Sequence, residues 1–234
     1  MDILVPFEQP IRQVRFVRRE KRFLVLVEDG TEKFWVHTNN SGSMLGLLRP
    51  GEEMLISKSP NPKRKLPWTL EAVYANDDWC CVNTSMPNKI LYAAFEHRAL
   101  PELAKATKLQ REAKVGQSRL DARFESPGGD IWVEAKNVTL VEDNSAAFPD
   151  AVTVRGQKHL RELMALAAQG LRVAGFYLVS LAGAHCFAPA DYIDPEYASL
   201  FYQALDAGVE AWPYTAKVTP QGVGLDRRLP VWRN

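Results

Sequence analysis

Apolar and polar residues alternate along the first third of the chain, in short runs separated by turn-forming residues. Residues 23–38, FLVLVEDGTEKFWVHT, place two β-rich segments around a Glu-Asp-Gly turn, which is a strong hairpin signal. Further β-rich runs occupy residues 52–59, 66–75 and 78–83. The Asn-Asn-Ser-Gly cluster at 39–42 is typical of a turn or a helix cap. Because no helical period interrupts these runs, they predict a small closed β-barrel.

Apolar residues at helical spacing appear after residue 83. Residues 86–104 carry Pro87 where a first helical turn would begin, which predicts a helix. Residues 153–170 predict a second, amphipathic helix that ends at a glycine. Its apolar face consists of Leu160, Leu163, Met164 and Ala167. A third helix is predicted at residues 195–208.

β-like runs lie between these helices. They occupy residues 109–116, 118–125, 130–141, 171–181 and 209–218. Strands that alternate with helices predict a mixed sheet with helices packed on it. We therefore expect a mixed α+β protein of two domains, with an N-terminal barrel at residues 1–83 and a C-terminal α/β domain at residues 84–234.

Composition and charge narrow the classes of function. The chain has 234 residues, of which 46% are hydrophobic and 24% are charged, so it contains enough apolar material for a core. The formal net charge is +1, which excludes a basic field over the whole protein. Any nucleic-acid binding must therefore come from local basic patches.

Cysteine usage and the apolar stretches bear on location. Cys80, Cys81 and Cys186 form no CxxC pair, so a zinc ribbon or a thioredoxin-type site is unsupported, and so sparse a set suits a reducing cytoplasm. The first residues lack a basic segment followed by a long apolar core, so no signal peptide is expected. The apolar stretch 172–188 is better explained as a buried strand with its exit loop than as a membrane span, so no membrane partner is expected.

Charged residues stand inside the two β-like runs on either side of the turn-forming residues 126–130. Asp121 lies in the first run, and Glu134 and Lys136 lie two residues apart in the second. Alternate side chains of a strand share a face, so Glu134 and Lys136 point the same way. If the two runs form a hairpin, Asp121 lies near Glu134.

Neighbouring carboxylates repel each other unless positive charge lies between them. A hard divalent cation meets this need, because Mg²⁺ binds one or two carboxylates and keeps its waters. Such an ion lowers the pKa of a bound water, and a lysine beside it stabilises developing negative charge. The pattern therefore indicates hydrolysis of a phosphodiester, with Asp121 and Glu134 as ligands of Mg²⁺ or Mn²⁺ and Lys136 as the catalytic lysine. The alternative is an ordinary set of charges on an exposed strand face.

Two further polar residues are candidates for the same site. Glu112 either supplies another carboxylate from the preceding run or is a surface charge beside basic neighbours. Gln157 falls on the inward face of the helix at 153–170, near its N-terminus. It either reaches a site at the edge of the sheet or is an ordinary polar residue of a first turn. His159, one position off that face, is given no role.

Basic residues cluster twice in the N-terminal third. The two clusters contain Arg18, Arg19, Lys21 and Arg22, and then Lys63, Arg64 and Lys65 followed by Trp68. Basic side chains neutralise phosphates, and exposed aromatic rings stack on bases. We interpret the clusters as a nucleic-acid-binding surface, although the aromatic residues near them are more typical of a barrel core.

Several segments resemble the sugar fermentation stimulation protein (SfsA) family. They are KRFLV, NNSGSM, KRKLPWTLE, CVNT, SRLDARF, WVEAKNVTL and FPDAVTVRGQKHLRELM, and together they cover essentially the whole chain. The resemblance implies that the N-terminal barrel is an OB-fold. It also implies that the C-terminal domain is of the PD-(D/E)xK nuclease type, with a mixed sheet.

The resemblance also suggests roles for individual residues. It assigns Asp121 as the first metal-binding acid, Glu134 and Lys136 as the paired acid and lysine, Glu112 as the upstream acid and Gln157 as the polar residue of the following helix. Leu120 stands where such nucleases often have proline, and Ser41 stands where the family more usually has threonine. Neither departure affects the predicted metal site.

The leading interpretation is a cytoplasmic, divalent-metal-dependent nuclease that binds DNA or RNA through its barrel. The alternative is a non-catalytic DNA-binding regulator of sugar-metabolism genes of the maltose type. The trio Asp121, Glu134 and Lys136 favours the enzyme, because a pure binding module has no reason to gather these residues. The sequence leaves open the choice between DNA and RNA, the strand state of the substrate, and whether the chain forms a homodimer.

Overall fold

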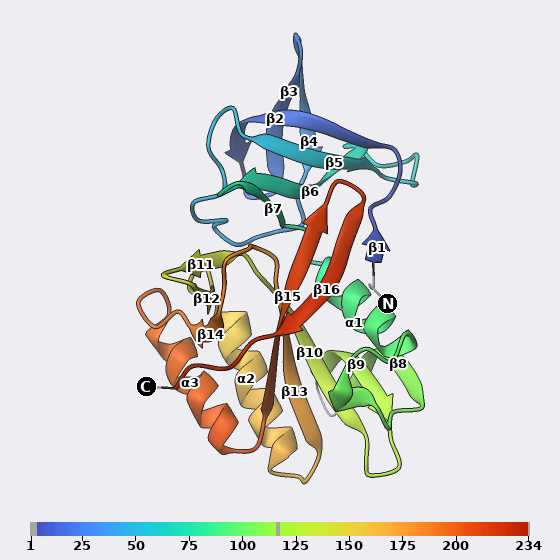
Figure 1. The fold of residues 1–234 in the computed structure, drawn as a ribbon, viewed down its shortest axis with the longest axis vertical. Coiled ribbons are helices and arrows are strands. Elements are labelled where there is room, and N and C mark those ends of the chain that lie inside the picture. Colours follow the sequence, from blue (N-terminus) through green and yellow to red (C-terminus); the bar gives the residue numbers. More distant parts are fainter. Residues whose placement is uncertain (1–3, 116–117, 234) are drawn as a thin grey trace.

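The computed structural model describes residues 4–115 and 118–233, which form two lobes stacked along the long axis of the molecule (Figure 1). The barrel lobe consists of β2 (Ile11–Glu20), β3 (Leu24–Asp29), β4 (Glu32–His37), β5 (Glu53–Lys58), β6 (Trp68–Ala75) and β7 (Asp78–Cys81). These strands form one sheet in the order β4-β3-β2-β5-β6-β7. A parallel contact between His37 and Thr69 joins β4 to β6 and closes the sheet into the predicted barrel.

The barrel core follows from alternation in its strands. Val14 and Phe16 of β2 and Val25 and Val27 of β3 point inward at period two, and they belong to one buried apolar cluster. A β-bulge between Phe16 and Arg18 interrupts the pairing of β2 with β3, and a bulge of this kind increases local twist and bends a strand. The bulge therefore helps β2 to curve around the barrel.

The α/β lobe is built on a mixed seven-stranded sheet. Its strands are β1 (Leu4–Pro6), β16 (Gly222–Arg228), β15 (Glu210–Thr219), β13 (Arg172–Val179), β10 (Ile131–Val138), β9 (Ser118–Glu125) and β8 (Lys108–Val115), in that order. The central pairs β10–β13 and β13–β15 are parallel, and the outer pairs are antiparallel. A small second sheet contains β11 (Leu140–Glu142), β12 (Ser145–Phe148) and β14 (Cys186–Pro189).

Helices cover both faces of the large sheet (Figure 1). They are α1 (Met86–Glu96), which the 3₁₀ turn η1 (Pro101–Leu103) follows, α2 (Val154–Ala167) and α3 (Pro195–Asp206). Successive residues of β13 serve the two faces: Phe176 and Leu178 join the cluster around α1, whereas Tyr177 and Val179 join the cluster around α2 and α3. A strand that is buried on both faces explains the continuous apolar run there.

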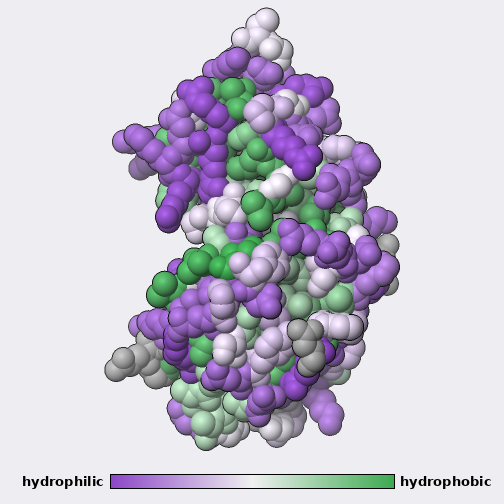
Figure 2. Space-filling model, turned by 90° about the vertical axis from the view of Figure 1, so that its left-hand side faces the viewer, coloured by the Kyte–Doolittle hydropathy of each residue, from purple (hydrophilic) through white to green (hydrophobic). Residues whose placement is uncertain are grey.

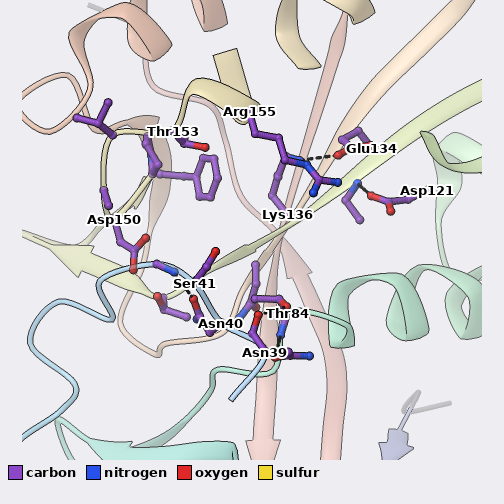
Figure 3. A pocket seen from close by; sticks show the side chains of 18 of the residues that line it. Asn39, Asn40, Ser41, Thr84, Asp121, Glu134, Lys136, Asp150, Thr153 and Arg155 are labelled. Atoms are coloured by element: carbon purple, nitrogen blue, oxygen red, sulfur yellow. Dashed lines mark hydrogen bonds and ion pairs between the residues drawn. The ribbon is translucent and has the colours of Figure 1, made fainter. Parts of the chain in front are cut away.

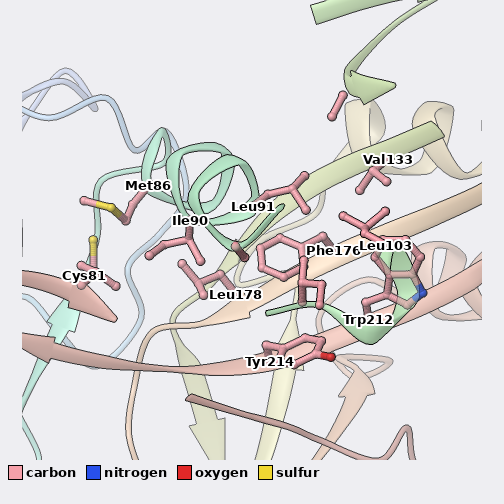
Figure 4. Close-up of a cluster of buried hydrophobic side chains, with 14 of the residues drawn as sticks. Cys81, Met86, Ile90, Leu91, Leu103, Val133, Phe176, Leu178, Trp212 and Tyr214 are labelled. Carbon is pink, nitrogen blue, oxygen red and sulfur yellow. The ribbon is translucent and has the colours of Figure 1, made fainter. Parts of the chain in front are cut away.

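An apolar contact joins the two lobes. The cluster around α1 contains Cys81 at the end of the barrel, close to Met86 and Ile90 of α1 and Leu178 of β13 (Figure 4). Leu55 of β5 belongs to the same cluster. Because this core is continuous across the junction, the lobes are held together by burial and not only by the connecting chain.

Most predicted elements are confirmed, and so is the hairpin of β9 and β10 across residues 126–130. The sequence missed β1, β11, β12 and β14, which have only three or four residues each, too few to show a period. It also missed β16, which contains two glycines, and treated β2 only as a basic cluster. Among the described residues, none of the helices is long and apolar enough to span a bilayer.

Gly222 is expected to control the docking of β1 on the edge of the large sheet. A Cβ at this position would lie 2.8 Å from the Cα of Pro6 and closer still to the carbonyl oxygen of Val5, both rigid backbone atoms. We predict that Gly222→Ala lowers the free energy of unfolding by about 1–3 kcal/mol, the usual cost of overpacking. Gly128→Ala is the control, because nothing lies within 4 Å of a Cβ there. Equal urea midpoints for the two variants would contradict this account.

Candidate active site between the barrel and the sheet

A cavity of about 460 Å³ lies between the two lobes, and both contribute to its walls. The barrel lobe supplies Arg22 and the loop 39–42, and the α/β lobe supplies Asp121, part of β10 and the segment 148–153. Figure 3 shows Asn39, Asn40 and Ser41 facing the charged residues of the sheet across this space. The predicted barrel therefore forms one wall of the predicted catalytic site.

Glu134 and Lys136 point to the same face of β10, as predicted. The Nζ atom of Lys136 donates to Oε1 of Glu134 at 2.6 Å. Only 6% of the Glu134 side chain and 18% of the Lys136 side chain are exposed, so this is a largely buried ion pair. Ala135, between them, packs against the apolar cluster on the opposite face. The surface-charge alternative does not fit this burial.

Asp121 lies where the ladder between β9 and β10 ends. The pairing stops at Ala122 and Val133. Just beyond it, Oδ2 of Asp121 accepts the backbone N–H of Ala135 at 2.8 Å, so the carboxylate takes the place of a ladder carbonyl. Oδ1 accepts a hydrogen bond from Asn88 of α1 at 3.0 Å. These two contacts hold Asp121 beside the Glu134–Lys136 pair.

Burial and charge act differently on the two carboxylates. Burial, and then the negative charge of Glu134, raises the pKa of Asp121, and its hydrogen bonds offset only part of this. Burial would raise the pKa of Glu134 as well, but the positive charge of Lys136 and the contact with His159 bring it down to about 2. Glu134 is therefore firmly ionised, and Asp121 is the more readily protonated of the two.

His159 belongs to this cluster, although no sequence pattern pointed to it. Its Nδ1 atom contacts Oε1 of Glu134 and lies 3.1 Å from Nζ of Lys136. Its Nε2 atom accepts from Nε of Arg155 at 3.4 Å, and Arg155 lines the cavity. One feature of the sequence could have indicated His159, namely its place two residues after Gln157 on the same helix. The face of this helix that contacts the sheet is wider than the stripe of apolar residues suggested.

Gln157 is buried on α2, but it does not line the cavity. Its Nε2 atom donates to both oxygens of Asp194, at 2.9 and 3.1 Å. Asp194 also accepts the backbone N–H groups of Thr153 and Tyr197, both at 2.9 Å. Gln157 thus helps Asp194 to tie together the first turns of α2 and α3. This placement corrects the expectation that its side chain reaches the site.

Glu112 is also placed away from the cavity. It lies on β8 between Arg111 and Ala113, whose partners on β9 flank Asp121. Its backbone has a positive φ of 49°, and its exposed carboxylate contacts Arg119 at 3.4 Å. Glu112 is therefore a surface charge, which was the alternative interpretation of this residue. It does not contribute the expected further carboxylate to the cavity.

The residues of the first basic cluster have different surroundings. The guanidinium of Arg18 lies 5.3 Å from the ring centroid of Trp35 and pairs with Glu20 at 2.7 Å. Lys21 and Arg22 form the turn between β2 and β3, both with positive φ. Of these residues, Arg22 is placed in the wall of the cavity.

Arg19 has a structural environment. Its guanidinium donates to the carbonyl oxygens of Asn40 at 2.6 Å and Gly42 at 2.8 Å, which fixes the loop that forms the barrel wall of the cavity. Burial lowers the pKa of Arg19, and the charge of Asp150 opposes this. Arg19 therefore supports the cavity from behind and is not one of its lining residues.

The second basic cluster lies in the loop between β5 and β6, where Lys63 and Lys65 are exposed. Arg64 is half-buried, and it donates to the hydroxyl of Thr69 at 2.8 Å. The ring of Trp68 carries an arginine guanidinium of β2 at 5.3 Å from its centroid. That arginine covers a face that a base would need for stacking, and Lys63 and Lys65 are the fully exposed cations of this cluster.

Asp150 connects the barrel loop to the segment before α2. Its carboxylate accepts the backbone N–H of Met44 at 2.8 Å, and its carbonyl accepts from the hydroxyl of Ser43 at 2.5 Å. Gly42 lies against the same carboxylate, because a Cβ there would be 2.5 Å from Oδ1. We call this contact the Asp150 latch. It joins the barrel loop 39–43 to the segment 148–153 on the far side of the cavity.

Two carboxylates at the cavity suit a hard divalent cation. Asp121 and Glu134 both line it, and the charge of Glu134 adds to the effect of burial in raising the pKa of Asp121. Among the described residues, Oε2 of Glu134 has no hydrogen-bond partner. No cluster of three or more His, Cys, Asp or Glu residues is found in the described part of the chain, so a cation there would rely partly on water ligands. Mg²⁺ is commonly bound in this way.

The fold defines a class of two-domain proteins in which an OB-type barrel is joined to a mixed α/β sheet, with the charged cavity between them. Residues 17–82 match the SfsA N-terminal OB domain, and residues 85–222 match the Sugar fermentation stimulation protein RE domain. The chain therefore belongs to the sugar fermentation stimulation protein (SfsA) family, as the sequence segments indicated.

Relatives agree with this assignment along nearly the whole chain. A sugar fermentation stimulation protein homologue of Syntrophobacter fumaroxidans is 57% identical and covers 97% of this chain and 87% of its own length. A homologue of Pseudomonas aeruginosa is 46% identical, with coverage of 96% and 98%. The solved structure of Pyrococcus furiosus SfsA in complex with Ca²⁺ superposes with a TM-score of 0.91, at 29% identity and full coverage of both chains.

Gln157→Ala is now expected to change stability more than chemistry. The variant removes a donor to the buried Asp194 carboxylate, and such a loss typically costs about 1–3 kcal/mol of unfolding free energy. Urea unfolding of the variant measures this effect. Unchanged stability together with slower phosphodiester cleavage would restore the catalytic role predicted from the sequence.

Asp194 should also give the protein a pH-dependent contribution to stability. Burial would raise its pKa, but hydrogen bonds from the backbone N–H groups of Thr153 and Tyr197 outweigh this and lower it. A lowered pKa stabilises the fold above the ordinary aspartate range, and this stabilisation is lost as the pH falls. The difference in unfolding free energy between wild type and Asp194→Asn should therefore shrink between about pH 5 and pH 3. A constant difference across that window would contradict this assignment.

Proposed function

We propose that this protein is a divalent-metal-dependent nuclease that hydrolyses phosphodiester bonds of DNA or RNA. The observation that carries the proposal is the meeting of Asp121, Glu134 and Lys136 at one wall of the cavity between the lobes. Burial of charged groups is costly, and a binding module gains nothing from it at this position. An acid on one strand and Glu-x-Lys on the next is also the arrangement that the family resemblance implies for PD-(D/E)xK nucleases.

Asp121 and Glu134 would hold one Mg²⁺ or Mn²⁺ ion. When bound, such an ion lowers the pKa of a water ligand and polarises a phosphoryl oxygen. Lys136 lies against Glu134 at 2.6 Å and lines the cavity, so its ammonium group is placed to orient a water and to stabilise negative charge on the phosphoryl oxygens. His159 contacts the same oxygen of Glu134 and limits the freedom of the carboxylate.

The cation bound by a relative supports the choice of a hard metal ion. The solved structure of Pyrococcus furiosus SfsA is described as a complex with Ca²⁺. Ca²⁺ and Mg²⁺ are both hard cations that take oxygen ligands, and carboxylates are common among them. Ca²⁺ prefers more ligands and longer bonds than Mg²⁺. Asp121 and Glu134 are the pair of carboxylates that meets at this wall of the cavity. Because Mg²⁺ is usually bound by one or two carboxylates together with waters, the proposal for this chain is Mg²⁺ or Mn²⁺.

Substrate binding is proposed for the barrel lobe and the cationic residues of the cavity. Lys63 and Lys65 are exposed on the barrel, and Arg22 and Arg155 line the cavity from opposite lobes. Such residues attract the phosphate backbone without regard to sequence. A cytoplasmic location, expected from the sparse cysteines, agrees with a nucleic-acid substrate.

The catalytic trio can be tested by single substitutions. Asp121→Ala and Glu134→Ala should each abolish cation-dependent cleavage, because one carboxylate cannot fix the ion alone. Lys136→Ala should slow cleavage by about 10²–10³, the usual cost of losing a group that acts in the transition state. Glu112→Ala should retain the wild-type rate, because this carboxylate is exposed and paired with Arg119. The assay uses labelled single- and double-stranded DNA and RNA with Mg²⁺, with Mn²⁺ and with a chelator.

The controls decide between the enzyme and the alternative regulator. Each variant is compared with wild type for thermal unfolding and for binding of the same nucleic acids in the chelator. Cleavage by Lys136→Ala at the wild-type rate, or no cation-dependent cleavage of any substrate by wild type, would contradict the nuclease proposal. Retained binding in that second case would favour the non-catalytic DNA-binding regulator.

The barrel lysines should act on binding alone. Replacing Lys63 and Lys65 together with alanine should weaken nucleic-acid binding and reduce the slope of log affinity against log salt by about 0.7–0.9 for each phosphate that is no longer neutralised. Arg64 is left in place because it donates to Thr69. Lys105→Ala is the control, since this lysine is exposed elsewhere on the surface. An unchanged affinity and salt slope in the folded double variant would remove this cluster from the binding surface.

A further inference from the structure

We propose that a single nucleic-acid strand runs from the candidate active site into a second cavity, where Arg64 and Lys89 hold a backbone phosphate. The inference rests on the proposed nuclease function and names its substrate as single-stranded DNA or RNA. The second cavity is also about 460 Å³, and Asn39 lines both cavities. The two cavities are therefore neighbours that share a wall residue, and the proposed strand would cross from one to the other beside Asn39.

The second cavity lies where the barrel closes. His37 and Thr69, the residues that join β4 to β6, both line it, together with Lys89 from the first turns of α1. Asn39 is fixed at the boundary, because its amide donates to Asn83 at 2.6 Å and its oxygen accepts from the backbone of Thr84 at 3.0 Å. The boundary between the two cavities thus has a defined position between the barrel and α1.

The two cavities contain cations that suit a phosphate, and the first also contains the acids Asp121, Glu134 and Asp150. Besides Lys136, which pairs with Glu134, four basic residues line them, namely Arg22, Arg64, Lys89 and Arg155. Within the described part of the chain, none of these four forms an ion pair, whereas arginines such as Arg172 and Arg228 are paired with acids. Cations that lack a carboxylate partner beside a cavity are available to an anion.

Two acids, Glu71 and Glu8, also line the second cavity. Glu71 is 4% exposed, and its two oxygens accept from Ser57 at 2.6 Å and from Asn83 at 2.7 Å. Its carboxylate is therefore satisfied by the protein itself. Glu8 is exposed to solvent, which screens its charge.

The volume of the first cavity supports a single-stranded substrate. The Asp150 latch holds the barrel loop 39–43 opposite Glu134 and Lys136, and the space between them is about 460 Å³. Cavities of about 300–1,000 Å³ enclose ligands of small-molecule size, whereas the major groove alone of duplex DNA is about 12 Å wide. A space of this volume is of the size of one or two nucleotides, so we infer that it takes a single strand.

The surface of the molecule agrees with a strand path between the lobes. Figure 2 shows that this face is hollowed between the lobes, with mainly hydrophilic surface over the barrel lobe and an apolar band at the level of the hollow. Val152, which lines the first cavity, and the neighbouring Val154 are 67% and 73% exposed. Unpaired bases offer apolar faces to such residues, and a duplex buries those faces in its stack.

The test measures binding without cleavage. Fluorescein-labelled oligothymidylate and oligouridylate of about 4–16 nucleotides, the range of site sizes on OB-folds, are titrated with the full chain in EDTA and followed by anisotropy. A matched blunt duplex is the competitor. Lys89→Ala should weaken single-strand binding several-fold and lower the salt slope by about 0.7. Lys89→Glu should weaken it further, and Lys217→Ala, which removes an exposed lysine of β15, should bind as wild type does.

Each outcome bears on the inference. Thermal unfolding of Lys89→Ala must match wild type, and Arg64→Lys, which keeps the charge, should retain most of the affinity if the phosphate is held by charge. Binding by Lys89→Ala and Lys89→Glu that equals that of Lys217→Ala, or a duplex that competes as well as the single strand, overturns the inference. The two oligonucleotide types show whether the path takes DNA, RNA or both.

A cleavage experiment separates this inference from the proposed function. Wild type is incubated with Mg²⁺ or Mn²⁺ and either circular single strands or closed circular duplex. Equal cleavage of both circles refutes the single-strand path and leaves the nuclease proposal standing. Binding that depends on Lys89 without any cleavage refutes the nuclease proposal and leaves the path standing.

Discussion

The buried ion pair between Glu134 and Lys136 is the interaction on which the rest of the cavity depends. A buried carboxylate without its partner is strongly destabilising, so β10 needs Lys136 beside it. His159 contacts the same oxygen and thereby brings α2 against the sheet at a fixed place. The segment before α2 carries Asp150, and Asp150 holds the barrel loop. One charged pair in a central strand is thus connected, contact by contact, to the position of the other lobe.

The end of the β9–β10 ladder gives the cavity its second carboxylate. Where the strands separate after Val133, the N–H of Ala135 would lack a partner, and Asp121 supplies one. The same side chain therefore has a structural contact and faces the cavity. Because the negative charge of Glu134 is close, this position favours either a proton on Asp121 or a cation between the two acids.

The sequence predicted the elements with a clear period and the residues that share a strand. Period two placed Glu134 and Lys136 on one face, and the hairpin placed Asp121 near them. The prediction from sequence failed for residues whose roles depend on partners that are distant along the chain. Gln157 and His159 lie on one helix, but their roles depend on Asp194 from the N-terminus of α3 and Glu134 from β10, which are distant along the chain. Likewise, no local pattern indicated that the barrel loop would wall the cavity or that Lys89 would line a second one.

Gly42 sets the height of the cleft by having no side chain. It lies so near the Asp150 carboxylate that either this carboxylate or the barrel loop would have to shift to admit even a methyl group. The spacing of the proposed strand path therefore depends on a residue that is neither Asp121, Glu134 nor Lys136. We expect larger side chains at this one position to act as spacers between the lobes and so to change the thickness of the polymer that the proposed path admits.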